Sequence, residues 1–427
     1  MKFKSWCQTL GSLLLWPAAA ALAQPTLESA RADVPQSTTS FTLQELVRTV
    51  LVNNPALQIA RRNREQATAG IDTAGALPNP RLEWSEGRLH PAAPAGASGR
   101  VSGWGLSQLI ENPSLRNARI DAAQYGSRSS EALVDLTRGD IVAQVRERAY
   151  EYLLRIEEAQ AAADALALLE QTRERVRVRV GSGESARYAI IKADAEFISA
   201  RQRQQSAQLA VEQMRIRLNQ LAAGHLPPGW SLRASLGDAL PVLERDRLRE
   251  QLLANNPELI GLRAEVERQQ ARVREAAASR WPGVELRYTE WREPDNRQGV
   301  LGASIQIPLW DQRRGPRAES EAELMRARTR LDGRQAELLL QLDAAWAALD
   351  MARLRVEALG SGAVREAEAA LRVAEAAYRF GERGILDVLD AQRVLRAVRA
   401  DLLQARYQMQ AGAIEIDVLT GRDAAQP

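Results

Sequence analysis

Cysteine and histidine are almost absent from this 427-residue sequence. Cys7 is the one cysteine, and His90 and His225 are the two histidines. A single cysteine cannot form a disulfide within the chain, and two distant histidines argue against a zinc, haem or Cys–His catalytic site. The sequence also has no Ser/His/Asp set and no phosphate-binding loop, so an enzyme is the least favoured class. We therefore expect no cofactor and no bound metal.

Lysine, net charge and aromatic side chains are scarce as well. Beyond Lys2 and Lys4 the sequence has one lysine, Lys192, and its 57 basic and 54 acidic residues leave a net charge of +3. This small excess argues against a nucleic-acid-binding face, so no nucleic-acid partner is expected. Aromatic residues make up 5% of the chain, which is low for a globular core of this length. Alanine, leucine, arginine, glutamate and glutamine dominate instead, a composition typical of long helices.

Residues 1–23 have the features of a secretory signal peptide. Lys2 and Lys4 precede an apolar stretch at 10–22, and the run Ala-Leu-Ala at 21–23 predicts cleavage before Gln24. The alternative is a membrane anchor, but the stretch is shorter than the roughly 20 apolar residues that span a bilayer, and it contains Pro17. Residues 24–40 would then be an N-terminal extension. No later segment is apolar over 18 residues, so the mature chain could enter a membrane only as β-strands.

The second half of the chain repeats the first about 200 residues later. The run Asn-Asn-Pro-x-Leu at 53–57 recurs at 255–259. Each copy opens a helical stretch (43–76 and 243–280), followed by two strand-like runs and a very long helical run with a glycine-rich break. We expect a first repeat at 41–222, a linker or equatorial segment at 223–242, a second repeat at 243–421 and a tail at 422–427.

The long runs have the apolar spacing of coiled coils. In the last helix, apolar residues recur at alternating steps of three and four: Val388, Ala391, Leu395, Val398, Leu402, Ala405 and Met409. The runs 115–180 and 316–380 would each be about 100 Å long at about 1.5 Å per residue. A glycine-rich break lets each run fold back as a hairpin, and we interpret four glycines as turn residues: Gly181, Gly183, Gly381 and Gly384.

The strand-like runs at 81–89, 100–109, 284–289 and 301–307 alternate apolar and polar residues, most clearly in the second half. Four tryptophans in or beside them suit a girdle at the membrane interface: Trp84, Trp104, Trp291 and Trp310. The alternative is packing at a soluble sheet. Four strands cannot close a membrane barrel, which starts at about eight, so several copies of the chain would have to share one.

Over residues 41–421 the chain resembles the TolC-like outer-membrane efflux family. The most specific motif is Gly-Glu-Arg-Gly-Ile-Leu-Asp-Val-Leu-Asp-Ala at 381–391, which is similar to the family's G-x-R-x-x-x-D-V-L-D-A run. The stretches 110–119 and 307–315 resemble strand-to-helix junctions of the heavy-metal (cobalt–zinc–cadmium, CzcC-like) branch. The resemblance implies a mainly α fold with a small β part. Duplicated coiled-coil hairpins would form a periplasmic tunnel, and four strands per chain would contribute to a 12-stranded barrel shared by a homotrimer.

By the same resemblance the protein is a passive channel in the cell outer membrane. Its partners would be outer-membrane lipid, a periplasmic adaptor and a proton-driven inner-membrane pump, and its cargo divalent heavy-metal cations. An exit duct for drugs or secreted polypeptides is the alternative within the family. Outside the family, the alternatives are a periplasmic adaptor and a purely structural coiled-coil protein. Adaptors lack duplicated amphipathic strand pairs, and a coiled coil alone does not explain the strands together with the export signal.

Asp387 and Asp390 follow the second glycine break and lie three residues apart, hence on one helical face. In a trimer they would form two rings of three carboxylates that attract cations and repel anions. The alternative is that both acids complement the helix macrodipole.

Three further residues match family positions that latch the closed entrance: Tyr378, Arg383 and Arg406. Arg406 follows Asp390 by 16 residues and so lies on the returning helix, where the alternative is an exposed flank of the coiled coil. In the family a first-half acid completes this latch, but this sequence has Ala189 there. The resemblance therefore implies an incomplete latch or one built differently. It also makes the hairpin tips with their four glycines the contact surface for the adaptor.

Overall fold

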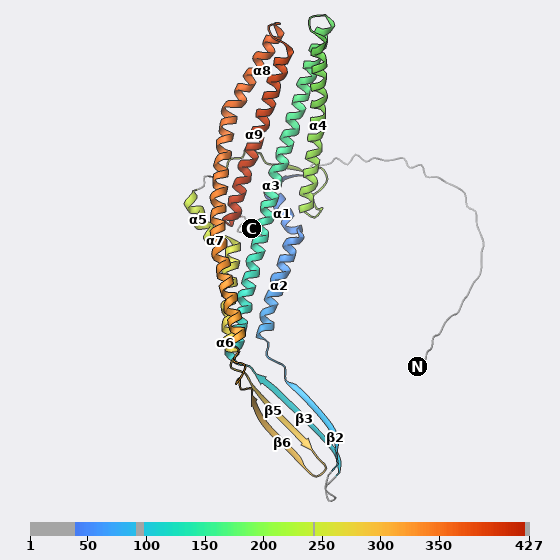
Figure 1. The fold of residues 1–427 in the computed structure, drawn as a ribbon. Helices are drawn as coiled ribbons and strands as arrows, with labels where there is room; N and C mark the ends of the chain where they lie inside the picture. The colour runs from blue at the N-terminus through green and yellow to red at the C-terminus, as the bar shows by residue number, and fades with distance from the viewer. Residues whose placement is uncertain (1–38, 91–97, 242–243, 423–427) are drawn as a thin grey trace, which may run out of the picture. The chain divides into compact units, whose positions relative to one another are not determined.

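The computed structural model describes residues 39–90, 98–241 and 244–422 (Figure 1). The predicted signal peptide, most of the N-terminal extension and most of the C-terminal tail lie outside the described residues. Within the described ranges, no helix combines the length and the apolar character needed to cross a membrane.

The two halves fold into the same succession of elements. The first half contains β1 (Ser40–Thr42), α1 (Leu43–Asn53), α2 (Pro55–Gly75), β2 (Arg81–Leu89), β3 (Gly99–Ile110), α3 (Pro113–Gly181) and α4 (Arg187–Leu221). After β4 (Ser231–Arg233), the second half contains α5 (Arg245–Asn255), α6 (Pro257–Ala278), β5 (Val284–Arg292), β6 (Arg297–Ile305), α7 (Arg314–Ala358), the π-helical segment η1 (Leu359–Ala363), α8 (Val364–Arg379) and α9 (Ile385–Leu419).

The repeated Asn-Asn-Pro motif breaks each predicted helical stretch into two helices. Asn54 caps α2 by accepting a hydrogen bond from the Ala56 N–H (2.9 Å), while its amide donates to the Leu221 carbonyl at the end of α4 (3.1 Å). Asn256 caps α6 in the same way and donates to the Leu419 carbonyl at the end of α9 (3.0 Å). The motif therefore ties the start of each repeat to the end of its hairpin.

The four long strands form one antiparallel sheet in the order β2-β3-β5-β6. Residues paired across such a sheet share a face, and neighbours along a strand alternate between faces. One face carries three mainly apolar rows: Ile110, Val284 and Ile305; Gln108, Leu286 and Ala303; and Leu82, Leu106, Tyr288 and Leu301. The opposite face carries the polar side chains of Arg81, Glu83, Ser107, Glu285, Arg287 and Thr289. This one-sided pattern is the one expected for strands between lipid and water.

The tryptophans of the sheet divide between its two faces. Trp84 and Trp104 are paired in register on the apolar face, inside their strands rather than at the strand ends. Trp291 lies on the polar face over Gly103, where an added Cβ would lie 2.6 Å from the indole ring. Trp310 follows β6 and is 93% exposed. The register thus argues against a place for Trp291 in a lipid-facing girdle.

The segment predicted as a linker contains a short strand. β4 pairs in parallel with β1, and next to it Trp230 is buried between Phe41 (ring centroids 6.4 Å apart) and Tyr152 (5.1 Å). This contact joins the linker to α3 and to the start of the first repeat. Three-residue strands have no sequence periodicity, which is why the pairing could not be predicted.

The long helices pack as their heptad pattern predicts, with one exception. The first run is an uninterrupted helix, α3, but the second contains the π-helical segment η1 instead of continuing from 316 to 380. This segment has the sequence Leu-Gly-Ser-Gly-Ala, none of its residues is buried, and the Ser361 hydroxyl donates to the Glu357 carbonyl (2.6 Å). The two glycines have low helix propensity, and the hydroxyl competes for a backbone carbonyl. Both weaken the α-helical hydrogen bonds at this point.

Candidate pore entrance at the hairpin tips

The two hairpin turns have the same backbone geometry. Gly183 follows α3 with φ +79°, and Gly381 follows α8 with φ +78°. In each turn the next residue, Glu184 or Glu382, donates its N–H to a carbonyl of the last helical turn at 2.9 Å. This is the Schellman arrangement, which places glycine in the left-handed conformation. The tips therefore correspond at an offset of 198 residues.

The other two predicted turn glycines have different surroundings. Gly181 is the last residue of α3, and Gly384 is the N-cap of α9. Neither has a positive φ, and a Cβ added at either would meet no atom within 4 Å. The turn geometry thus requires glycine at one position per tip, not at two.

The offset of 198 residues shows how the tips differ in charge. Asp387 corresponds to Ala189, and Asp390 corresponds to Lys192. Asp387 is exposed in the first turn of α9 and makes no ion pair with any described residue. Asp390 is also exposed, but it forms an ion pair with Arg393 one turn further along the helix. The two predicted pore carboxylates therefore have unequal free charge.

An apolar cluster joins the two hairpins below their turns. Its buried members come from all four helices: Leu169 and Val176 of α3, Ala189 and Ala193 of α4, Leu371 and Tyr378 of α8, and Ile385, Val388, Leu389 and Leu395 of α9. A buried polar contact crosses the same boundary, because the Gln392 amide donates to the Thr172 hydroxyl (3.3 Å). Figure 1 shows the α3–α4 and α8–α9 hairpins side by side with their turns at the same end.

Arg179 of α3 connects the tips directly. Its guanidinium donates hydrogen bonds to the carbonyl oxygens of Tyr378 (2.8 Å) and Arg379 (3.1 Å) in the last turn of α8. The same group lies over the Tyr378 ring, 4.5 Å from its centroid. Carbonyls at a helix C-terminus carry partial negative charge, so a cation is stabilising there. Arg179 thus caps α8 from the neighbouring hairpin.

The structure separates the residues that the family resemblance assigns to the latch. Tyr378 is 8% exposed, and its hydroxyl has no hydrogen-bond partner among the described residues. Arg383 is exposed in the turn. Arg406 lies 16 residues beyond Asp390 on α9, about 24 Å away at about 1.5 Å per residue. Ala189 is buried in the shared apolar cluster, so an acid at that position would have to be buried as well.

The first strand-to-helix junction that resembles the heavy-metal branch, residues 110–119, ties the start of α3 to the ends of α2 and α6. Glu111 accepts two hydrogen bonds from Arg119 (2.8 and 3.0 Å), and Arg119 also donates to the Ala74 carbonyl at the end of α2 (2.9 Å). Asn112 caps α3 and donates to two carbonyls near the end of α6, those of Ala278 and Trp281 (both 3.1 Å). The hydrogen bonds of Arg119 hold the pKa of the Glu111 carboxyl below its usual range.

Within residues 39–90, 98–241 and 244–422, no three His, Cys, Asp or Glu side chains are grouped so that they could hold a metal ion. The tips instead offer exposed carboxylates on a helical scaffold. Such groups can attract cations to a pore without binding them tightly.

A family model described as outer membrane efflux protein matches residues 46–224 and 248–422, which span both repeats. The chain belongs to the outer membrane efflux protein family. It is therefore a channel component of a tripartite efflux system in the cell outer membrane, and it is not an enzyme. Channels of this family are trimers that work with a periplasmic adaptor and an inner-membrane pump. These findings confirm the fold and the channel function expected from the sequence.

Individual relatives agree with the family assignment. The chain is 26% identical over 384 residues to the cobalt-zinc-cadmium resistance protein CzcC of Cupriavidus metallidurans, covering 90% of each chain. Its fold is similar to that of CusC, with a TM-score of 0.78, 19% identity and coverage of 88% of this chain and 91% of CusC. The MtrE outer membrane channel of Neisseria gonorrhoeae, solved in an open state, gives a TM-score of 0.75 at 19% identity, covering 89% and 88%.

Proposed function

We propose that this channel passes divalent heavy-metal cations, delivered by a proton-driven pump through an adaptor, to the outside of the cell. The observation that carries the proposal is the similarity to a cobalt-zinc-cadmium resistance protein along 90% of both chains. An exit duct for drugs or polypeptides would share the same fold, so the fold itself does not favour one cargo.

The exposed carboxylate of Asp387 supports a cationic cargo. In a trimer, three copies at the start of α9 would form a ring of negative charge that raises the local concentration of cations. Asp390 would add less, because Arg393 of the same chain offsets its charge. Asp387 is thus the main selectivity residue in this proposal. Asp390 lies on the same helical face and would line the aperture, but it would add little to the negative charge there.

The closed entrance in this proposal depends on Arg179 rather than on a first-half acid. The guanidinium reaches the tip of the second hairpin, where it binds two backbone carbonyls and covers the Tyr378 ring. Tyr378 then serves the latch through its ring and its carbonyl. Arg383 and Arg406 would engage neighbouring copies in the trimer. The tips around Gly183 and Gly381 would meet the adaptor.

The apolar face of the sheet would contact outer-membrane lipid. Trp84 and Trp104 lie on that face beside the rows of Leu106 and Tyr288, whereas Trp291 lies on the opposite face. We therefore keep the first two tryptophans, with the exposed Trp310 beyond β6, as membrane-contacting aromatics. Trp291 would instead face the water-filled side.

A susceptibility panel on a deletion strain tests the cargo. Growth is compared in zinc, cobalt, cadmium and nickel salts and in dyes, detergents and antibiotics. Selective sensitivity to the metals, restored by the intact gene, is the expected result. Sensitivity to the organic compounds alone would keep the channel and reject the metal cargo.

A further inference from the structure

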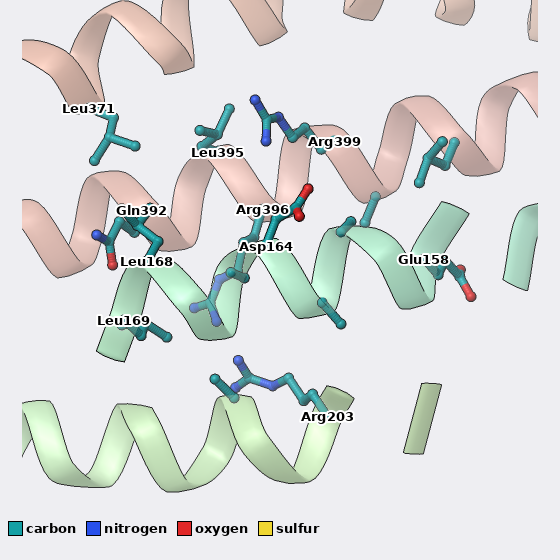
Figure 2. A pocket seen from close by; sticks show the side chains of 16 residues that line it. Glu158, Asp164, Leu168, Leu169, Arg203, Leu371, Gln392, Leu395, Arg396 and Arg399 are labelled. Atoms are coloured by element: carbon teal, nitrogen blue, oxygen red, sulfur yellow. The ribbon is translucent and has the colours of Figure 1, made fainter. Parts of the chain in front are cut away.

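A pocket of about 350 Å³ lies between α3 and α9, with α4 and α8 at its sides (Figure 2). Its walls are mostly alanine and leucine, including Ala165, Leu168, Leu395 and Leu403. Such a wall accepts an apolar body but offers it no orientation. The polar groups of the pocket therefore decide which molecule it fits.

Two arginines of the pocket have little compensating negative charge. Figure 2 shows the Arg396 side chain reaching from α9 across α3 toward α4, which carries Arg203. The acid nearest to Arg396 is Glu196, 3.9 Å away, and Glu196 is shared with Lys192 at 3.8 Å. Arg203 makes no ion pair within the described part of the chain. Burial, and then the charges of Arg203 and Arg393, lower the pKa of the Arg396 guanidinium.

Two of the three remaining charged groups of the pocket form ion pairs with residues outside it. Arg399 pairs with Glu368 of α8 (2.7 Å), and Glu158 accepts from Arg155 (2.7 Å). The third, Asp164, accepts from the neutral amide of Gln160 (2.9 Å) and keeps its charge, but Figure 2 shows its carboxylate pointing toward α9, away from Arg203 on α4. An incoming anion would therefore meet Arg203 and Arg396 as its partners. Guanidinium groups bind carboxylate and sulfate oxygens through paired hydrogen bonds.

Gln392, which lines the pocket, is held from behind by hydrogen bonds to α3. Gln392 is 4% exposed; its amide nitrogen donates to Thr172, whose hydroxyl donates in turn to the Leu168 carbonyl (2.8 Å). Its Oε1 is buried and has no hydrogen-bond partner among the described residues. This atom has almost no accessible surface, so it does not face the cavity and is not counted among the groups that would bind a ligand.

We propose that this pocket binds an amphiphile with one anionic group, which sits between Arg203 and Arg396 while its apolar part lies along α3 and α9. The acid-poor pair of arginines selects the negative charge, and the alanine- and leucine-rich wall selects the apolar body. The proposal is independent of the cargo of the channel. It concerns a site in the wall of the helical hairpins rather than at their tips.

The test uses the trimeric channel in nanodiscs of zwitterionic lipid, with 8-anilinonaphthalene-1-sulfonate as the fluorescent probe. Saturable binding above that of empty nanodiscs is expected. The double variant R203Q/R396Q should weaken it at least about tenfold, because charge-assisted hydrogen bonds are lost. The control variant R201Q changes an exposed arginine of α4 outside the pocket and should leave the dissociation constant within about twofold.

Competition and a filled pocket make the test specific. Dodecanoate should displace the probe, whereas dodecyltrimethylammonium, with the same chain and the opposite charge, should not. Ala165→Phe keeps both arginines but fills the pocket, and it should abolish binding in a channel that still elutes as a trimer. No saturable binding to the trimer, equal binding by the double variant, or equal displacement by both amphiphiles would each overturn the proposal.

Discussion

Removing the Arg179 side chain should release the second hairpin tip from the first. The guanidinium makes two hydrogen bonds to carbonyls, worth about 1 kcal/mol each, and a stacking contact worth about 0.5–1 kcal/mol. Arg179→Ala should therefore weaken the association of the two tips by about 2–3 kcal/mol. Since about 1.4 kcal/mol corresponds to a factor of ten, the ratio of separated to joined tips should rise about 30- to 150-fold.

Single-channel recording in planar bilayers measures this change as more frequent openings and a larger mean conductance. The matched control is Arg177→Ala, which removes an exposed arginine two residues earlier on α3 that makes no ion pair with a described residue. Tyr378→Leu should have a smaller effect than Arg179→Ala, because it removes the ring but leaves the carbonyl acceptor in place. If Arg179→Ala and Arg177→Ala have the same conductance and open probability, Arg179 does not hold the entrance.

Three further predictions concern selectivity, the turn and pH. Asp387→Asn should lower the cation concentration in the aperture about tenfold in 0.1 M salt, for three charges about 5 Å from the pore axis. Reversal potentials measure the change, and they should shift less for Asp390→Asn; equal shifts would contradict the pairing of Asp390. Gly183→Ala should destabilise the hairpin by about 1–2 kcal/mol in thermal unfolding, whereas Gly181→Ala should not. The ion pair of Glu111 should stabilise the folded chain fully above its ordinary pKa of 4.5 and lose this contribution as the pH falls through the lower folded value. Glu111→Gln should remove that part of the pH dependence of unfolding.

Periodic features of the structure could be predicted from the sequence because they are local. Heptad spacing predicts which face of α9 is buried, and Val388, Leu395 and Ala405 are indeed buried. The repeated motif at 53–57 and 255–259 correctly indicates a duplicated architecture. Alternation in β5 and β6 predicts a two-faced sheet. Each of these patterns repeats within one element, so no long-range contact is needed to recognise it.

The features that the sequence did not reveal depend on placement in three dimensions. Arg179 is one of four arginines that alternate with other residues at 173–180, and no pattern distinguishes the one that reaches the second hairpin. The face occupied by Trp291 depends on the strand register, and a shift of one residue would reverse it. The pairing of Asp390 with Arg393 follows from helical spacing and could have been predicted. The two glycines of η1 were likewise a visible signal for a break in the second long helix.

The metal cargo is tested most directly by following zinc out of living cells. A deletion strain carrying the wild-type gene or an empty vector is preloaded with radioactive zinc, and release into the medium is followed in zinc-free buffer. Our account predicts fast release with the gene and slow release without it. Release at the same rate from both strains would contradict the account.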